Sequence, residues 1–370
     1  MASSSQLRRS VRGHLLSSPA AAIGVFGPEG TSFTIDRKVF FMKPIRLPLL
    51  IAILTASLCR SQAPLKVGII GLDTSHATAF AQKLNDPSAP GYVPGAVVVA
   101  AFKGGSPTVE KSAHRIEGFT QEVTTKYHVR LVPTIAELCN QVDAVLLLSV
   151  DGRQHLDQVR AVFAAKKPVF IDKPLAGSLK DAREIVRLSR ESGVPFLSAS
   201  SIRYSPLFVD LKKDASLGTI QGAMTFGPMD IETYMPDLFW YGIHSVESLY
   251  QLMGPGCVRV ARVHTDGADT VVGPWKDGRI GEIRGLRSTP STYGAVVFGS
   301  KKVAVSSNLA HPEQAGAGAY DGLIVEIVKF FQTGNPTVSP AESLEVLAFM
   351  EAADRSKLQH GAEVPLEPIQ

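Results

Sequence analysis

Cysteine and excess charge are both scarce in this chain. Its 370 residues include three cysteines, and the spacing of Cys59, Cys139 and Cys257 fits no zinc or redox motif. The formal net charge is only +4, and basic residues are not interleaved with aromatic ones, which argues against a nucleic-acid partner. The composition that remains, 45% hydrophobic and 19% charged, is ordinary for a globular protein long enough for two domains.

Long hydrophobic runs are also lacking. The apolar run Leu47–Leu58 is too short, and too soon broken, for a stable membrane span. It follows the basic segment Met42–Arg46 and precedes small residues, which is the order of a secretory signal peptide. We therefore expect a signal peptide over residues 42–63, a true start at Met42, and a doubtful extension over residues 1–41. The mature protein would then be exported, either periplasmic or secreted.

The chain after the expected signal peptide begins like a dinucleotide-binding fold. Residues 65–70 predict a buried strand, Gly71 a tight turn, and the pattern that continues through Leu84 a helix. Gly71 occupies the first position of the glycine fingerprint, whereas Asp73 and His76 occupy the second and third. The motif therefore indicates the fold more strongly than it indicates a bound cofactor.

A carboxylate at Asp73 would repel a diphosphate in a partly desolvated cleft. We therefore expect one of two arrangements. Either a dinucleotide binds weakly, or its phosphates meet Thr74, Ser75 and the backbone amides of the helix start while Asp73 turns away. If repulsion limits the affinity, Asp73→Gly should tighten binding. Unchanged or weaker binding would instead give Asp73 a positive role, such as holding His76 or the substrate.

The end of the next strand bears on the choice of cofactor. The strand predicted over residues 96–102 ends in Lys103-Gly104-Gly105-Ser106, without the carboxylate that usually holds the ribose hydroxyls of NAD. Lys103 and Ser106 would suit the 2′-phosphate of NADP, although Lys103 is equally consistent with an exposed loop residue. NAD and NADP therefore both stay open.

The rest of the first domain alternates strands and helices, which predicts a parallel, doubly wound sheet. The expected elements are a helix over 134–138, a strand over 142–150, a helix over 155–165, a strand over 169–171, a helix over 179–192 and a strand over 194–198.

A second domain with a different pattern should follow. Strands are expected over 220–226, 258–263, 293–298 and 301–306, with one helix over 243–253 and a last helix over 341–358. The fold class is therefore α/β, a Rossmann-type domain over residues 64–199 joined to an α+β domain with a mostly antiparallel open sheet over 200–340. Residues 341–370 should return to the Rossmann domain.

The tripeptide Asp172-Lys173-Pro174 follows the short buried strand 169–171 directly. Proline cannot continue a strand ladder, and it biases the preceding lysine away from helical dihedrals. Lys173 is therefore presented at the carboxyl end of a strand, which is where open α/β sheets bind ligands.

Five motifs share a known pattern: the strand-glycine opening, the strand end Ser149…His155, Asp172-Lys173-Pro174, Arg203-Tyr204, and Gly242-Ile243-His244 at the start of a helix. They resemble the motifs of the Gfo/Idh/MocA family, named after glucose–fructose oxidoreductase and inositol dehydrogenase. The resemblance covers residue 65 to the C-terminus. It implies a two-domain NAD(P)-dependent oxidoreductase that acts on a hydroxyl or carbonyl group of a sugar, polyol or related small molecule.

The resemblance also implies roles for single residues. Lys173 and His244 would be catalytic, because hydride transfer needs a proton acceptor and a group that stabilises the developing alkoxide. The expected cofactor-binding residues are Gly71, Asp73, Thr74, Ser75, His76, Lys103, Ser149, His155, Asp172 and Lys173. The expected substrate-binding residues are Arg203, Tyr204, Trp240 and Glu247. Trp240 stands where family enzymes commonly carry an Asp, and Glu247 could replace that carboxylate.

Two other functions stay open. The same fold could carry a lyase, isomerase or hydrolase acting on keto-sugars, in which Asp73, His76, His155, His244 and Glu247 form a polar or metal-binding cluster. The chain could also be a non-catalytic sugar-binding module, although Lys173 and His244 argue against it. We expect no resident metal, a carbohydrate-like ligand, no stable membrane span after signal cleavage, and a homo-oligomer.

Overall fold

The computed structural model describes residues 63–289, 292–310, 318 and 320–369. The doubtful extension and nearly all of the expected signal peptide lie outside the described residues. Within the described residues, no helix combines the length and apolar character needed to cross a bilayer.

The first domain is a six-stranded parallel sheet in the order β3-β2-β1-β4-β5-β6. Its strands are β1 (Leu65–Ile70), β2 (Ala96–Phe102), β3 (Arg130–Val132), β4 (Ala144–Leu147), β5 (Val169–Ile171) and β6 (Phe196–Leu197). The chain order reverses between β1 and β4, so the carboxyl ends of these strands border a crevice suited to a ligand. The predicted Rossmann-type sheet is confirmed.

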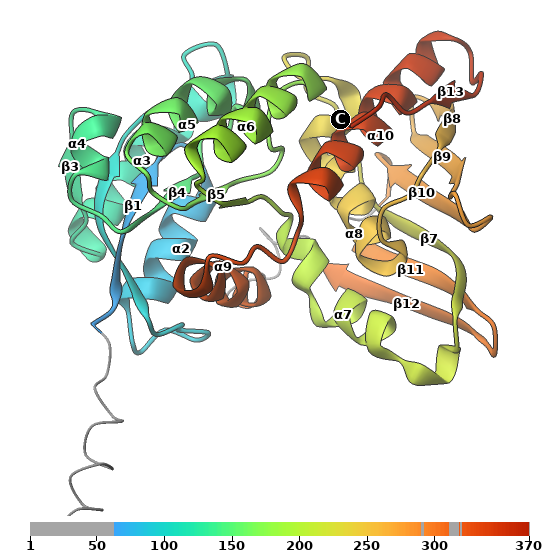
Figure 1. Ribbon diagram of the computed structural model, residues 1–370, viewed down its shortest axis with the longest axis horizontal. Coiled ribbons are helices and arrows are strands. Elements are labelled where there is room, and N and C mark those ends of the chain that lie inside the picture. Colours follow the sequence, from blue (N-terminus) through green and yellow to red (C-terminus); the bar gives the residue numbers. More distant parts are fainter. Residues whose placement is uncertain (1–62, 290–291, 311–317, 319, 370) are drawn as a thin grey trace, which may run out of the picture. The chain divides into compact units, whose positions relative to one another are not determined.

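Helices cover both faces of this sheet (Figure 1). They are α2 (Ser75–Asn85), α3 (Glu110–Lys126), α4 (Ile135–Cys139), α5 (His155–Ala164) and α6 (Leu179–Ser192). Successive strand residues point to opposite faces, so Ile69 packs with α2 while Ile70 packs with α4 and α5. The sequence did not predict α3, because its buried residues Ser112, Thr120 and Val123 form no apolar stripe.

The second domain is built on a seven-stranded sheet in the order β12-β11-β7-β10-β9-β8-β13. Its strands are β7 (Ile220–Pro228), β8 (Arg259–Thr265), β9 (Ala268–Pro274), β10 (Ile280–Leu286), β11 (Thr292–Gly299), β12 (Val303–Ala310) and β13 (Val364–Pro365). All neighbours are antiparallel except β7 and β10, which pair in parallel. The mostly antiparallel sheet is as predicted, but β9 and β10 were not expected.

Several shorter helices complete the two domains and the segment between them. They are 3₁₀ turns η1 (Gly152–Gln154), η2 (Ser201–Tyr204) and η3 (Ala215–Leu217), helix α7 (Pro206–Lys213), and the π-helical turn η4 (Leu238–Gly242) that leads into α8 (Ile243–Met253). Helix α8 packs on one face of the second sheet against β7 and β10.

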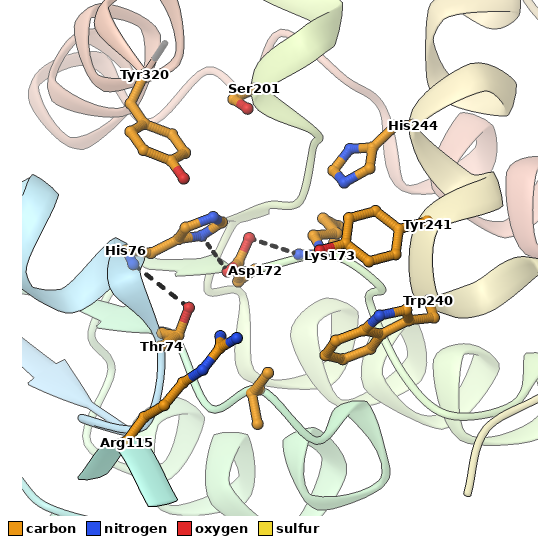
Figure 2. Close-up of a pocket in the computed structure, with 11 residues that line it drawn as sticks. Thr74, His76, Arg115, Asp172, Lys173, Ser201, Trp240, Tyr241, His244 and Tyr320 are labelled. Carbon is orange, nitrogen blue, oxygen red and sulfur yellow. Dashed lines mark hydrogen bonds and ion pairs between the residues drawn. The ribbon is translucent and has the colours of Figure 1, made fainter. Parts of the chain in front are cut away.

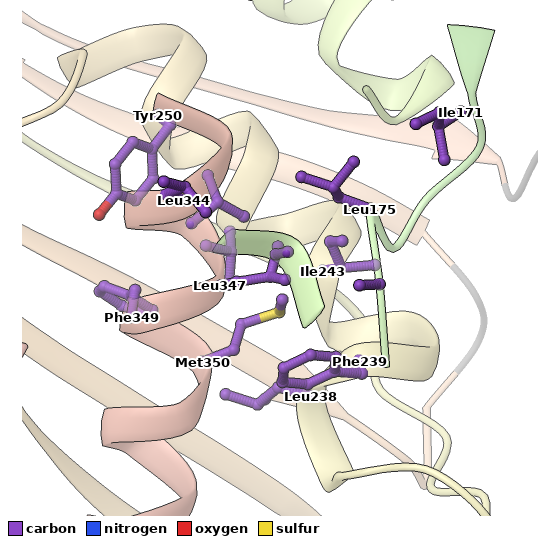
Figure 3. Close-up of a cluster of buried hydrophobic side chains, with 14 of the residues drawn as sticks. Ile171, Leu175, Leu238, Phe239, Ile243, Tyr250, Leu344, Leu347, Phe349 and Met350 are labelled. Carbon is purple, nitrogen blue, oxygen red and sulfur yellow. The ribbon is translucent and has the colours of Figure 1, made fainter. Parts of the chain in front are cut away.

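The last two helices join the two domains. Helix α9 (Asp321–Thr333), which the sequence did not predict, packs its apolar side against α2 of the first domain. Helix α10 (Pro340–Leu358) packs on β8 and α8, and its Glu351 Oε1 accepts a 2.7 Å hydrogen bond from the Leu179 amide at the start of α6. Figure 3 shows Leu347 and Met350 of α10 among side chains of η4 and α8.

Candidate active site

A cavity partly open to solvent lies where the strand ends of the first sheet meet η4 and α8 (Figure 2). Residues of both domains form its wall. The lining side chains are Thr74, His76, Arg115, Val150, Asp172, Lys173, Ser201, Trp240, Tyr241, His244 and Tyr320. The two residues expected to be catalytic, Lys173 and His244, therefore line one cavity.

Lys173 is placed by the end of β5. The Lys173–Pro174 peptide is cis, and the Lys173 amide donates to Asp172 Oδ1 at 2.8 Å. Lys173 Nζ lies 5.5 Å from the centroid of the Trp240 ring and 5.9 Å from that of Tyr241. Two electron-rich ring faces thus help to hold the ammonium group at the cavity wall.

Asp172 and His76 form a buried pair beside Lys173. His76 Nδ1 lies 2.5 Å from Asp172 Oδ2, and the His76 ring stacks on Phe80 at 5.5 Å and meets Tyr320 edge-on at 4.8 Å. Burial raises the pKa of Asp172, but the charges of His76 and Lys173 and the hydrogen bonds from these residues outweigh it and hold the pKa below its usual value. Asp172 is therefore an ionised group that orients two of its neighbours.

His244 stands in the first turn of α8, on the other side of the cavity. Its ring packs against Tyr241 and Tyr293, with centroids 5.9 and 5.8 Å apart. Its Nδ1 lies 2.6 Å from Ser200 Oγ. The ring is only 4% exposed, so its position is set by packing and by this hydrogen bond.

The glycine turn after β1 is closely packed, as its sequence position predicts. Gly71 has φ +91°, and a Cβ there would lie 2.5 Å from the Ser149 amide, so no larger residue fits. Ser75 begins α2, and Thr74 caps it by accepting a 3.3 Å hydrogen bond from the His76 amide. The first turn of α2, all of whose residues are described, carries no acidic side chain.

Asp73 is turned away from the cavity. Its carboxylate accepts hydrogen bonds from Ser112 Oγ at 2.7 Å and from the Val150 amide at 3.2 Å, and the residue is 1% exposed. Burial is the largest influence and raises the pKa of Asp73. The Asp73 carboxylate thus has the orientation that one of the two expected arrangements requires, and its hydrogen bond to Ser112 links the glycine turn to α3.

Several expected ligand-binding residues do not reach the cavity. Arg203 is 4% exposed and forms an ion pair with Glu247 at 3.1 Å and another with Glu342. The Tyr204 hydroxyl pairs with Thr337 Oγ1 at 2.6 Å. Arg203, Tyr204 and Glu247 therefore do not line this cavity as the structure has it, and they brace η2 against α8 and the start of α10.

Two of the expected cofactor residues have internal roles. The His155 ring is fully buried and contacts the carbonyl oxygens of Ser149 at 2.8 Å and Pro174 at 3.0 Å, so it ties the ends of β4 and β5 together. Ser149 is itself 1% exposed and packs on Gly71. Ser149 and His155 therefore support the strand ends that form the crevice, without lining the cavity themselves.

Lys103 lies outside the main cavity. It forms a short ion pair with Glu117 on α3 and borders a separate hollow with Gly104, Gly105 and Ser106. Ser106 is 3% exposed and its hydroxyl donates to Asp151 Oδ2 at 2.9 Å. These residues therefore lie together at the end of β2, as their spacing predicts.

Five cavity residues escaped the sequence analysis, and one of them, Val150, directly follows the expected Ser149. Arg115 lies on the unpredicted α3, and Tyr320 precedes the unpredicted α9. Tyr241 and Ser201 adjoin Trp240 and the Arg203-Tyr204 motif, so proximity to those motifs is the signal that could have found them. Arg115 and Tyr320 carry no such local signal.

Residues 65–200 match the model of an oxidoreductase family described as having an NAD-binding Rossmann fold, Gfo/Idh/MocA. An inositol 2-dehydrogenase of Paracoccus denitrificans is 40% identical over 74 residues, which are 20% of this chain and 22% of the relative. A putative oxidoreductase YceM of Salmonella typhimurium is 27% identical over 139 residues, 36% of this chain and 43% of the relative. The chain thus aligns with between a fifth and a half of these relatives' length.

Solved structures match over nearly the whole described chain. A probable dehydrogenase from Thermotoga maritima has a TM-score of 0.69 at 21% identity, with 83% of this chain and 100% of that one covered. A scyllo-inositol dehydrogenase from Lactobacillus casei, with bound NAD(H) and scyllo-inositol, has a TM-score of 0.69 at 13% identity, covering 82% and 99%. Residues 65–200 are therefore similar to the NAD-binding Rossmann domain of the Gfo/Idh/MocA oxidoreductases, and the fold shared with the solved structures extends over the rest of the described chain.

Proposed function

We propose that this protein is an NAD(P)-dependent dehydrogenase that acts on a CH–OH group, or its carbonyl, in a sugar, polyol or related molecule. The observation that carries the proposal is the meeting of Lys173, from the end of β5, with His244, from α8, in one cavity. The pairing puts two groups able to exchange protons beside the crevice of a dinucleotide-binding sheet.

The residues around the glycine turn fit a dinucleotide. The N-terminus of α2 points its amides toward the crevice edge, where a diphosphate is favoured by the helix dipole. Asp73 is engaged with Ser112 and Val150, so its carboxylate does not face that place. Arg115 lines the cavity beside Thr74 and adds a positive charge there. A bound nicotinamide dinucleotide would supply the hydride acceptor or donor.

The chain's own residues would then bind and orient the substrate. A hydroxyl between Lys173 and His244 can hydrogen-bond to both side chains, and one of them takes its proton. The positive charge left on that group stabilises oxygen as negative charge develops on it. Asp172 holds the Lys173 backbone, while Trp240, Tyr241 and Tyr320 limit the access of water.

The lining favours a small polyhydroxylated substrate. Hydroxyl, imidazole and charged groups alternate with aromatic rings around the cavity, a combination that can bind both the polar edges and the C–H faces of a sugar ring. Two relatives are named as inositol dehydrogenases, and they make cyclic polyols the first substrates to test.

A metal-assisted lyase, isomerase or hydrolase is the less supported alternative. Its candidate cluster does not assemble: His155 contacts backbone carbonyls, Glu247 pairs with Arg203, and Asp73 binds Ser112. Within the described residues, no group of three or more His, Cys, Asp or Glu side chains is arranged to hold a metal ion.

Native mass spectrometry and an activity assay test the proposal together. The purified protein should carry or take up one NAD or NADP, and it should reduce that cofactor with at least one of myo-inositol, scyllo-inositol or a panel of aldoses. If the protein neither binds a cofactor nor oxidises any compound of the panel, the dehydrogenase assignment is refuted. Metal analysis and an isomerase assay on keto-sugars would then address the alternative.

We also propose that the protein is exported and forms a homo-oligomer. Export follows from the signal-like residues 42–63, and N-terminal sequencing of native protein from cell fractions tests it. The oligomer is supported by apolar side chains exposed on the second sheet away from α8: Val263, Ile280, Phe298, Val303 and Val305. Light scattering coupled to gel filtration should give a multiple of the monomer mass, and Val305→Glu should lower it.

A further inference from the structure

The partner of His244 is a residue that the motifs do not include. Ser200 Oγ lies 2.6 Å from His244 Nδ1, and Ser200 is fully buried. Because Nδ1 is engaged, proton exchange between this imidazole and a ligand in the cavity goes through Nε2. The Ser200 contact therefore bears directly on what His244 can do.

A second hydrogen bond of the Ser200 hydroxyl indicates whether Ser200 or His244 is the donor in the bond between them. Ser200 Oγ accepts from the Ile202 amide at 3.2 Å, as the cap of η2. If His244 Nδ1–H also donated to this oxygen, the buried hydroxyl proton would need an acceptor, and the described residues place none there besides Nδ1. A buried unsatisfied hydroxyl costs about 1–3 kcal/mol. The favoured arrangement is therefore Ser200 O–H donating to Nδ1, which puts the proton of the neutral imidazole on Nε2.

Ser200 is itself held rigidly. Its backbone amide donates to Glu247, which is one turn after His244 on α8 and is paired with Arg203. Arg203 in turn pairs with Glu342 at the start of α10. These contacts tie η2, α8 and α10 together and thus fix the serine on the Nδ1 side of the ring.

We propose that Ser200 is a positioning residue that keeps neutral His244 in the Nε2–H tautomer. This inference rests on the proposed function for its consequence. His244 then donates a hydrogen bond from Nε2 to the substrate oxygen, and Lys173, after its ammonium group has released a proton to solvent, takes the hydroxyl proton. The C–H electron pair and its hydrogen leave as hydride to the oxidised nicotinamide, so the alcohol becomes a carbonyl and Lys173 an ammonium ion.

Nitrogen NMR of selectively ¹⁵N-histidine-labelled protein tests the tautomer without any turnover. At a pH where His244 is neutral, its ring should show a protonated Nε2 and an unprotonated Nδ1, with the signals assigned by their loss in His244→Gln. Ser200→Ala should give a mixture of tautomers, and Ser200→Thr, which keeps the hydroxyl, should restore the wild-type pattern. A protonated Nδ1 in wild type, or no change in a folded Ser200→Ala, overturns the inference. Should Ser200→Ala not fold, the wild-type spectrum alone decides.

Kinetics with an accepted polyol and NAD⁺ or NADP⁺ test the role. Gln presents an N–H near the Nε2 position and Asn does not, so His244→Gln should keep at least about 10-fold more kcat than His244→Asn. Ser200→Ala should lose about 10-fold in kcat with little change in KM, and Ser200→Thr should recover most of it. Equal losses in the two His244 variants overturn the donor role. Absence of any turnover in wild type would count against the proposed function, and the NMR result would stand separately.

Discussion

His76 and Asp172 are in direct contact, with Nδ1 and Oδ2 2.5 Å apart, although they lie far apart in the chain. The contact joins the start of α2 to the end of β5 and lies beside Lys173 (Figure 2). It gives the third position of the degenerate glycine fingerprint a function: the imidazole compensates a carboxylate that burial would otherwise neutralise.

Replacing His76 by Ala should destabilise the fold and make it more sensitive to acid. The change leaves the Asp172 carboxylate buried with less compensation, at a cost on the order of 3 kcal/mol. Because the pKa of Asp172 is lowered in the folded protein, its carboxylate contributes stability at pH values above 3.8. This contribution is lost as the pH falls through the pKa of the folded state. Without His76 the folded pKa rises, so acid unfolding, followed by circular dichroism, should begin at a higher pH. His114→Ala, an exposed histidine on α3, should leave the curve in place.

Lys173→Met should remove turnover and spare the fold. The amine that receives the substrate proton is lost, which should reduce kcat by about 10²–10⁴-fold. Only a partly exposed side chain changes, so the free energy of unfolding should shift by less than about 1 kcal/mol. Lys180→Met, at an exposed position in α6, is the matched control. Turnover near the wild-type rate in Lys173→Met would remove this residue from the mechanism.

Asp73→Gly should destabilise the protein and fail to improve dinucleotide binding. The variant deletes acceptors for Ser112 Oγ and the Val150 amide, at a cost of about 1–3 kcal/mol. Calorimetry with NAD and NADP should show equal or weaker affinity, because the carboxylate does not face the crevice. A double-mutant cycle with Ser112→Ala should give a coupling free energy above about 0.5 kcal/mol. Tighter dinucleotide binding in Asp73→Gly would instead indicate that repulsion between this carboxylate and the diphosphate limits the affinity.

Glu247 should make stability fall as pH rises toward neutrality. Burial is the largest cause and raises its pKa to about 7, against the lowering effect of Arg203 and with the help of Glu342. Between the ordinary glutamate pKa of 4.5 and about 7 the folded protein holds a proton that the unfolded chain has released, so unfolding becomes easier with increasing pH. Urea titrations across this range should show the slope in wild type and a flatter one in Glu247→Gln. The exposed Glu191→Gln should keep the wild-type slope.

Lys103→Ala should distinguish the two cofactors. If the hollow at the end of β2 takes a 2′-phosphate, loss of this ammonium should weaken NADP binding by about 10-fold, which is about 1.4 kcal/mol. NAD binding should stay within about twofold. Lys126→Ala, farther along α3 and exposed, should change neither. Calorimetric titrations that show the same loss for NAD and NADP would contradict a specific phosphate contact.

The sequence by itself determined the class of fold and two main residues of the candidate site, Lys173 and His244. Short buried strands, each followed by a turn residue and a helix, specify a parallel sheet because the helix returns the chain to the same edge of the sheet before the next strand begins. Capped helices such as Leu179–Ser192, with Ser178 before and Gly193 after, were located to the residue. Lys173 was placed at a strand end by Pro174, a purely local constraint.

Elements whose buried face is not apolar were beyond the sequence. Helix α3 presents Ser112 and Thr120 inward, and these residues are indistinguishable from surface residues until their partners are known. Helix α10 was predicted over 341–358, but nothing in the sequence marks its Glu345 as buried; the carboxylate accepts hydrogen bonds from the Tyr250 hydroxyl and two amides. Hydrophobic periodicity detects apolar faces only.

Which polar residues face the cavity was decided by the tertiary structure alone. Asp73, Arg203 and Glu247 have the residue types of a binding site, yet each is satisfied internally by Ser112 or by an ion pair. Ser200 and Arg115 have no motif, yet long-range packing brings one to His244 and the other to the cavity wall. A charged or hydroxyl side chain will bind whichever partner the fold supplies, and spacing along the chain carries no information about a partner 40 or more residues away.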